Sequence, residues 1–102
     1  MPICCTCEER SLHAAISGEI DHHGAKSVMQ ELDVQIAQHM PRELLLDCGG
    51  ITFMDSSGIA VLLRAWQKIH GLGGTMSVRN MPTQAGKVLK AAGLDRLISL
   101  NP

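Results

Sequence analysis

The sequence predicts one α/β domain over residues 1–102, with a mixed, mostly parallel sheet that begins with an antiparallel hairpin. The length of 102 residues suits one domain, and the hydrophobic fraction of 45% suits one buried core. Strand-like and helical stretches follow one another in the order β-β-α-β-α-β-α-β. This alternation is typical of parallel sheets, because each helix carries the chain back across the sheet.

The first part of the chain predicts a hairpin, a loop and a helix. Strand patterns cover residues 3–8 and 12–17, and the short polar connection Glu9-Arg10 joins them as an antiparallel pair. Glycines flank the charged residues 18–24, which predicts a loop. Apolar residues at helical spacing predict a helix over residues 25–39.

The second part begins with residues 44–48, a continuous apolar run that predicts a central strand covered on both faces. Gly49-Gly50 is expected to break this strand. The strongest helical pattern follows over residues 57–70. The remaining elements are expected to be a strand over 75–79, a helix that opens at Pro82 or Thr83 and closes at Gly93, and a short strand over 97–100.

Charge and aromatic content argue against several classes of partner. Nine basic and ten acidic residues give a net charge of -1, with no basic stripe for nucleic acid or an anionic membrane. The two aromatic residues, Phe53 and Trp66, provide little surface for stacking bases. No apolar run approaches the roughly 20 residues that span a bilayer, and the N-terminus lacks a secretory pattern. We therefore expect a cytoplasmic protein that binds neither nucleic acid nor membrane.

The four cysteines, Cys4, Cys5, Cys7 and Cys48, are interpreted as reduced thiols at small apolar strand positions. Cys4 and Cys7 have C-x-x-C spacing, but no second pair completes a structural zinc site. A redox or metal role for these thiols stays open. The adjacent residues His22-His23 also lack partners at ligand spacing, so no metal site is predicted.

Two polar segments are expected to share one rim of the sheet. Asp55-Ser56-Ser57 follows the central strand and opens a helix, whereas Asp21-His22-His23 follows the second strand. The carboxyl ends of neighbouring parallel strands meet at one edge, where functional groups collect. Asp and Ser are also good helix caps, but one of them is enough, and we assign the helix start to Ser57. The helix N-terminus would then stabilise a phosphate on Ser56 by about 0.3–1 kcal/mol.

Enzymatic interpretations of this rim are weaker. Ser56 with His22 or His23 and an Asp has the composition of a triad, but the G-x-S-x-G elbow is absent. The phosphate-binding G-x-x-x-x-G-K-[ST] loop is also absent. A small nucleotide-binding protein or enzyme that uses the same rim stays open as an alternative.

Four segments, in order along the chain, resemble the STAS-domain family of anti-sigma factor antagonists. Within that family, they are most similar to the sporulation antagonists of anti-sigma F. These segments are Gly18–His23, Phe53–Gly58, Gly73-Gly74 and Ala92–Leu94.

The resemblance implies a STAS domain over residues 1–102 that has no cofactor and no catalytic residue. It implies that the unphosphorylated form binds an anti-sigma factor that is also a serine kinase, which frees the sigma factor. Phosphorylation of Ser56 would end this interaction, and a PP2C-type phosphatase would restore it. A STAS scaffold module that is not phosphorylated is the alternative. The residues that the resemblance implies at the partner surface are Asp21, His22, His23, Asp55, Ser56, Ser57 and Gly58.

Overall fold

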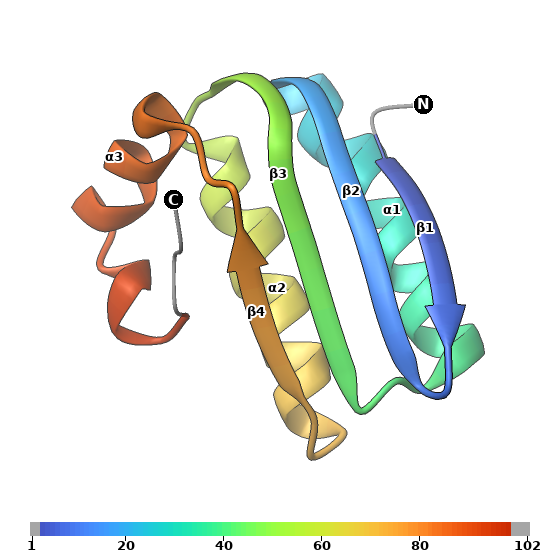
Figure 1. Ribbon diagram of the computed structural model, residues 1–102. Helices are drawn as coiled ribbons and strands as arrows, with labels where there is room; N and C mark the ends of the chain where they lie inside the picture. Colours follow the sequence, from blue (N-terminus) through green and yellow to red (C-terminus); the bar gives the residue numbers. More distant parts are fainter. Residues whose placement is uncertain (1–2, 99–102) are drawn as a thin grey trace.

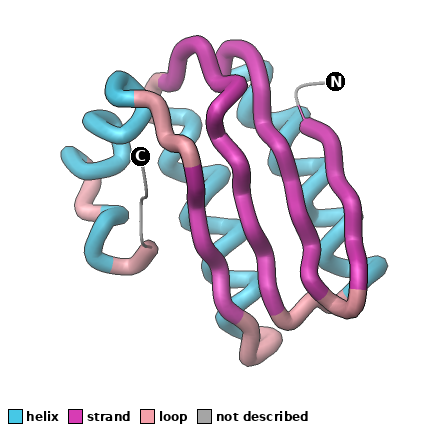
Figure 2. The backbone as a smooth tube through the Cα atoms, in the orientation of Figure 1, coloured by secondary structure: helices cyan, strands magenta, loops and turns pink. Residues whose placement is uncertain are grey.

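The computed structural model describes residues 3–98 and shows a four-stranded sheet with α1 and α2 packed against one face (Figures 1 and 2). The strands lie side by side in chain order, with β1 and β2 antiparallel and the later pairs parallel. The predicted fold class, a mixed and mostly parallel sheet that begins with a hairpin, is confirmed. The elements are β1 (Ile3–Glu8), β2 (Ser11–Ile20), α1 (His22–His39), β3 (Glu43–Met54), α2 (Ser57–Gly71), β4 (Thr75–Arg79), α3 (Thr83–Ala91) and the 3-10 helix η1 (Leu94–Arg96).

The N-terminal hairpin turns at the two residues predicted for it. Glu9 and Arg10 both have positive φ, at 50° and 65°. Two-residue turns with this conformation match the right-handed twist of the strands that they join. The hairpin therefore sets β1 firmly beside β2, with Ile3 opposite Ile16 and Glu8 opposite Ser11.

The core is aliphatic and lies between the sheet and its helices. Alternate residues of β2 and β3 point toward the helices, as the period of a half-buried strand requires. The apolar stripes of α1 and α2 cover them. Buried members include Leu12, Ala14, Ile16, Leu44, Leu46 and Cys48 from the sheet, and Val28, Leu32, Ile36, Val61, Leu62, Ala65 and Ile69 from the helices.

The expectation that the central strand is covered on both faces is wrong. Leu44 and Leu46 are fully buried, but Leu45 is only half-buried and Asp47 is exposed. Leu45 alternates with the buried Leu44 and Leu46 and so lies on the opposite face of the sheet, whereas α1 and α2 lie against one face only (Figure 1). Its neighbours on β2, His13 and Ala15, are also exposed. The apolar run predicted coverage on both faces wrongly, because burial alternates along the strand although residues 44–46 are all leucine.

Two predicted loops are part of regular elements instead. The segment expected to form a loop over 18–24 extends β2 to Ile20 and begins α1 at His22, because Asp21 caps the helix at that point. Gly49-Gly50 does not break β3, which continues to Met54 with shifts in its pairing to β2. A Cβ on Gly50 would lie 2.9 Å from the Cβ of Ser17, so glycine permits the close approach of the strands there.

The C-terminal part departs from prediction in one element. Helix α3 begins at Thr83, as expected, and Gly93 follows it with a positive φ of 80°. Residues 94–96 form η1, and Leu97 and Ile98 belong to no strand. The remaining residues of the strand predicted over 97–100 lie outside the described residues. No helix within residues 3–98 is long and apolar enough to cross a bilayer.

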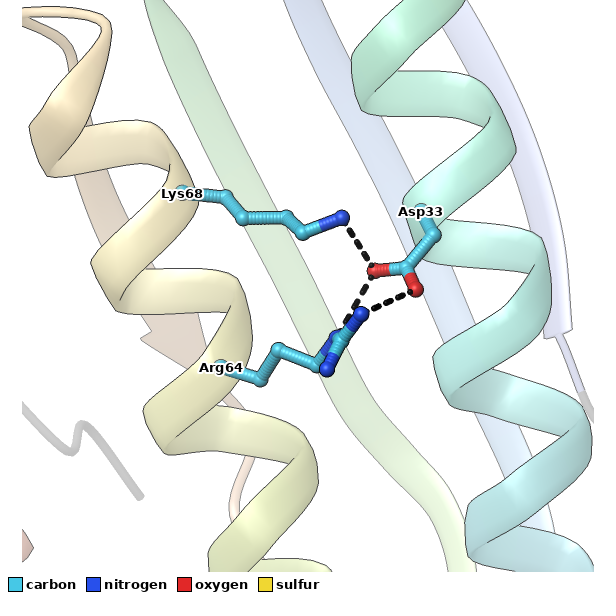
Figure 3. Close-up of polar contacts among 3 residues, drawn as sticks. All are labelled: Asp33, Arg64 and Lys68. Carbon is cyan, nitrogen blue, oxygen red and sulfur yellow. Dashed lines mark hydrogen bonds and ion pairs between the residues drawn. The ribbon is translucent and has the colours of Figure 1, made fainter.

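An ion-pair cluster joins the outer surfaces of the two long helices (Figure 3). Asp33 of α1 contacts Arg64 at 3.0 Å and Lys68 at 2.8 Å, both on α2. Burial acts to raise the pKa of the Asp33 carboxyl, but the hydrogen bonds and charges of Arg64 and Lys68 outweigh it and hold that pKa below its ordinary value. The carboxylate therefore stabilises the folded state wherever it is ionised.

We predict that Asp33→Asn lowers the thermal unfolding midpoint by about 2–5 °C near neutral pH, because the two cations lose their shared partner. A carboxyl whose pKa is lower in the folded state stabilises the fold above its unfolded pKa. This stabilisation is lost as the pH falls through the folded pKa, so the difference should shrink as acid protonates the carboxyl below the ordinary pKa range of an aspartate. Asp95→Asn is the control, since Asp95 pairs with no cation among residues 3–98. Equal midpoints for wild type and Asp33→Asn in calorimetry at neutral pH would contradict the account.

Candidate functional site

The candidate site is the rim where β2 and β3 end and where α1 and α2 begin. Ile20 and Met54, the last residues of the two strands, are paired in parallel register. The N–H of Asp55 donates to the carbonyl of Ile20 at 3.2 Å, which holds the two strand ends together. Both strand-to-helix connections therefore lie at the same end of the sheet, at the top of Figure 1. The predicted proximity of the two polar segments is confirmed.

Asp21 closes the start of α1. Its Oδ1 accepts a hydrogen bond from the N–H of Gly24 at 2.9 Å, and its carbonyl accepts one from Ala25. A Cβ on Gly24 would lie 2.3 Å from the carbonyl oxygen of Glu19, so only glycine fits at this turn. Asp21 thus has a structural task that is sufficient to explain its presence.

His22 and His23 occupy the first turn of α1, not the loop in which they were expected. Both side chains are exposed. Within residues 3–98, no three His, Cys, Asp or Glu side chains gather closely enough to hold a metal ion.

Asp55, not Ser57, satisfies the start of α2. Its Oδ1 accepts from the N–H of Ser57 at 2.8 Å, and its carbonyl accepts from Gly58 at 3.1 Å. The assignment of this task to Ser57 was therefore wrong. An aspartate two residues before the helix can fold back onto the chain through its short side chain, and the sequence did not distinguish this arrangement from a serine cap.

Ser56 is exposed, and its hydroxyl makes no capping hydrogen bond. Its backbone is already helical, with φ −62° and ψ −15°, so its side chain points away from the position from which an N-cap usually bonds. Because Asp55 bonds the nearest free N–H group, the hydroxyl of Ser56 is left available to another molecule.

The backbone N–H groups of the first three residues of α2 are already hydrogen-bonded. The N–H groups of Ser57 and Gly58 bond to Asp55, and that of Ile59 bonds to the carbonyl of Ser56 at 3.2 Å. The helix dipole remains, and no acidic residue lies in this turn. A phosphate on Ser56 would thus meet a weakly favourable field next to one carboxylate and displace no helix hydrogen bond.

Gly58 permits close packing of α2 on the end of β3. It is buried, and a Cβ there would lie 2.5 Å from the Sδ of Met54. Gly58 therefore contributes to the site through its lack of a side chain.

Two further residues belong to the rim although sequence reasoning gave them no role. Phe53 is 44% exposed, an unusual state for a large aromatic side chain, and it lies three residues before Ser56. The exposure of Phe53 depends on the point in β3 at which buried and exposed residues stop alternating regularly. The sequence does not show where this point lies.

Gln84 of α3 binds the end of β3 through both atoms of its side-chain amide. Its Nε2 donates to the carbonyl of Met54 at 2.7 Å, and its Oε1 accepts from the N–H of Met54 at 2.9 Å. β4 pairs with β3 only as far as Asp47, so Gln84 provides at Met54 the two bonds that a neighbouring strand would make. No sequence signal could have identified it, since it lies 30 residues from its partner.

Comparison with known proteins agrees with this geometry. The family model described as "Mlab, STAS domain" matches residues 7–99. An anti-sigma F factor antagonist from Paenibacillus polymyxa is 31% identical over 85 residues, which cover 83% of this chain and 73% of the relative. An anti-sigma-B factor antagonist from Bacillus subtilis is 25% identical over 93 residues, which cover 91% of this chain and 84% of the relative.

Solved structures share the fold. The anti-sigma factor antagonist SpoIIAA in its unphosphorylated form superposes with a TM-score of 0.83 at 21% identity, covering 98% of this chain and 87% of that one. The Bacillus SpoIIAA in its phosphorylated form gives a TM-score of 0.76 at 20% identity, covering 98% and 90%. The chain belongs to the STAS-domain family. The resemblance to anti-sigma factor antagonists drawn from its residues is confirmed by these relatives.

We predict that Gln84→Ala lowers the free energy of unfolding by about 1 kcal/mol, because both polar groups of Met54 lose a partner on one side. Lys87→Ala is the matched control, since Lys87 is exposed on the same helix and has no hydrogen bond to β3 among the described residues. Urea unfolding of the two variants measures the difference. If both variants match the wild type, Gln84 does not hold the strand end.

Proposed function

We propose that this protein is an anti-sigma factor antagonist whose unphosphorylated form binds an anti-sigma serine kinase and releases the sigma factor. Phosphorylation of Ser56 ends that interaction, and a PP2C-type phosphatase reverses it. The protein then acts in the cytoplasm without a cofactor or catalysis of its own. The observation that carries the proposal is the exposed hydroxyl of Ser56 at the rim, which is free because Asp55 caps α2.

The rim also supports the proposal as a surface for a protein partner. Phe53 exposes apolar area beside Ser56, and His22 and His23 expose polar groups at the start of α1. Buried aromatic anchors surrounded by polar groups are typical of protein interfaces. The backbone that carries these groups is fixed by Asp21, Asp55, Ser57 and Gly58.

The relatives supply the identity of the partner in the proposal. Their names describe antagonists of anti-sigma factors, and one similar structure is described as a phosphorylated form. A kinase that transfers phosphate to a serine requires an accessible hydroxyl in a segment that fits its active site. Ser56 meets the first requirement, whereas Ser57 is half-buried and forms the first residue of α2.

We predict that Ser56→Ala abolishes phosphate transfer from a cognate anti-sigma kinase and ATP, since the acceptor hydroxyl is removed. Ser57→Ala is the matched control and should be phosphorylated, because it removes the neighbouring hydroxyl and leaves the bond between its N–H and Asp55 in place. Intact mass before and after incubation gives the stoichiometry. Phosphorylation of Ser56→Ala at the wild-type rate would rule out the assignment.

We predict that Ser56→Asp folds with near wild-type stability but binds the kinase roughly a hundredfold more weakly. A new unit charge about 5 Å from a partner carboxylate costs about 3 kcal/mol at an effective dielectric of about 20. At the helix N-terminus of the free protein, the same charge shifts stability by less than about 1 kcal/mol.

The control for this variant is Gln67→Asp, which adds the same charge to an exposed position of α2 about 16 Å along the helix axis. Calorimetric titration with the kinase should show little change for it. Equal weakening by both variants would mean that net charge, not position, governs binding. Loss of cooperative unfolding in Ser56→Asp would contradict the argument from the helix start.

A further inference from the structure

The outer edge of β1 is an unpaired strand edge. The sheet has the order β1-β2-β3-β4, and β1 pairs with β2 alone among the described residues. At such an edge, alternate residues direct their N–H and C=O groups outward, ready to pair with another strand. β1 is six residues long, which is enough for several inter-strand hydrogen bonds.

This edge lacks the features that usually prevent pairing. Residues 3–8, Ile-Cys-Cys-Thr-Cys-Glu, contain no proline, lysine or arginine, and their one charge is Glu8 at the end. The opposite edge is different. β4 has five residues and ends with Arg79, and Leu97 lines a hollow of about 200 Å³ together with Thr75 and Met76 of β4. The two edges of the sheet are therefore not equivalent.

The charge on β1 favours antiparallel pairing with a second copy of itself. A parallel, in-register pair would place Glu8 beside Glu8, and like charges directly opposite each other are destabilising. An antiparallel pair moves each Glu8 toward the uncharged N-terminal half of the other strand. A two-fold axis perpendicular to the sheet generates this arrangement and keeps the helices of both copies on one side.

The side chains of β1 also match themselves under this symmetry. Cys5 and Cys7 are half-buried on the helix side, whereas Cys4 and Thr6 are exposed on the other face. The two-fold axis sets residues of the same sheet face opposite each other. One central register sets Cys5 opposite Cys5, with Cys4 opposite Thr6. The next sets Thr6 opposite Thr6, with Cys5 opposite Cys7. Within β1, the first register sets only uncharged side chains opposite each other, which suits cross-strand packing, whereas the second sets the charged Glu8 opposite Cys4.

We infer that β1 joins two copies of this chain edge to edge, in the antiparallel register centred on Cys5, into a continuous eight-stranded sheet. The pairing is non-covalent. Burial, with smaller contributions from Glu31 and Cys4, raises the pKa of the Cys5 thiol to about 11, so this thiol stays protonated at neutral pH.

The dimer leaves both rims free. The two-fold reverses the direction of the strands, so the rim of one copy lies at one end of the joined sheet and that of the other copy at the opposite end. Each Ser56 follows β3, which lies two strands away from the shared edge. The dimer therefore does not depend on the proposed function. It carries two rims, and hence two binding surfaces, in one particle.

The test is sedimentation equilibrium of the full chain in reducing buffer over a range of concentrations. The inference predicts a dimer whose fraction rises with concentration. In the register centred on Cys5, the double variant Cys4→Lys with Thr6→Lys sets the lysine at position 4 of each copy opposite the lysine at position 6 of the other, and its dimer dissociation constant should rise by about tenfold or more. The matched control is His13→Lys with Ala15→Lys, which alters the β2 residues paired with Thr6 and Cys4 and should still dimerise.

Thermal unfolding tests whether both double variants fold. Hydrogen exchange of the wild type independently locates the contact between the two copies. The amides of β1 should exchange more slowly as concentration rises, whereas those of β4 should not change. A chain that stays monomeric at every concentration would overturn the inference. It would also be overturned by a dimer that the lysines on β1 leave intact, or by protection that appears at β4 or elsewhere.

Discussion

The parallel pairing of β2 with β3 is the constraint on which the rest of the structure depends. It ends with Ile20 beside Met54, and the bond from Asp55 to Ile20 extends it into the connection. Because the two strands end at the same level, α1 and α2 begin at the same level, and their N-termini lie together. The Asp33 cluster with Arg64 and Lys68 then joins the same helices farther along their length. The rim is a consequence of strand register, not of the loop sequences alone.

At this rim, the structural contacts and the proposed phosphate acceptor fall to different side chains. Asp21 and Asp55 satisfy the two helix starts, Gly24 and Gly58 allow close approach, and Gln84 holds Met54 from the other side. Ser56 takes part in none of these contacts through its hydroxyl. A modification there changes charge at the surface while every hydrogen bond of the helix start persists. Under the proposed function, this separation lets Ser56 carry a switch without a cost to the fold.

Much of the fold followed from local patterns, and the errors have local causes. The periodicity of Ile59, Leu62, Leu63 and Trp66 identified α2, and the short polar tip identified the hairpin. The leucine run concealed an alternating strand, because leucine tolerates partial exposure. The start of α1 was misplaced, because the capping by Asp21 depends on where β2 ends. Ser56 was proposed as a site from the motif and stays a prediction, whereas Gln84 and the exposure of Phe53 arise only from tertiary contacts.

The central claim is that phosphate on Ser56 acts at the partner surface and leaves the domain intact. The most direct measurement is an amide NMR spectrum of the Ser56-phosphorylated chain, recorded alone and during titration with the kinase. The account predicts shifts confined to residues 21–24 and 53–59 in the free protein, with affinity roughly a hundredfold lower than that of the unphosphorylated chain. Shifts that spread through the buried residues of β2 and β3, or an affinity that phosphorylation leaves unchanged, would contradict it.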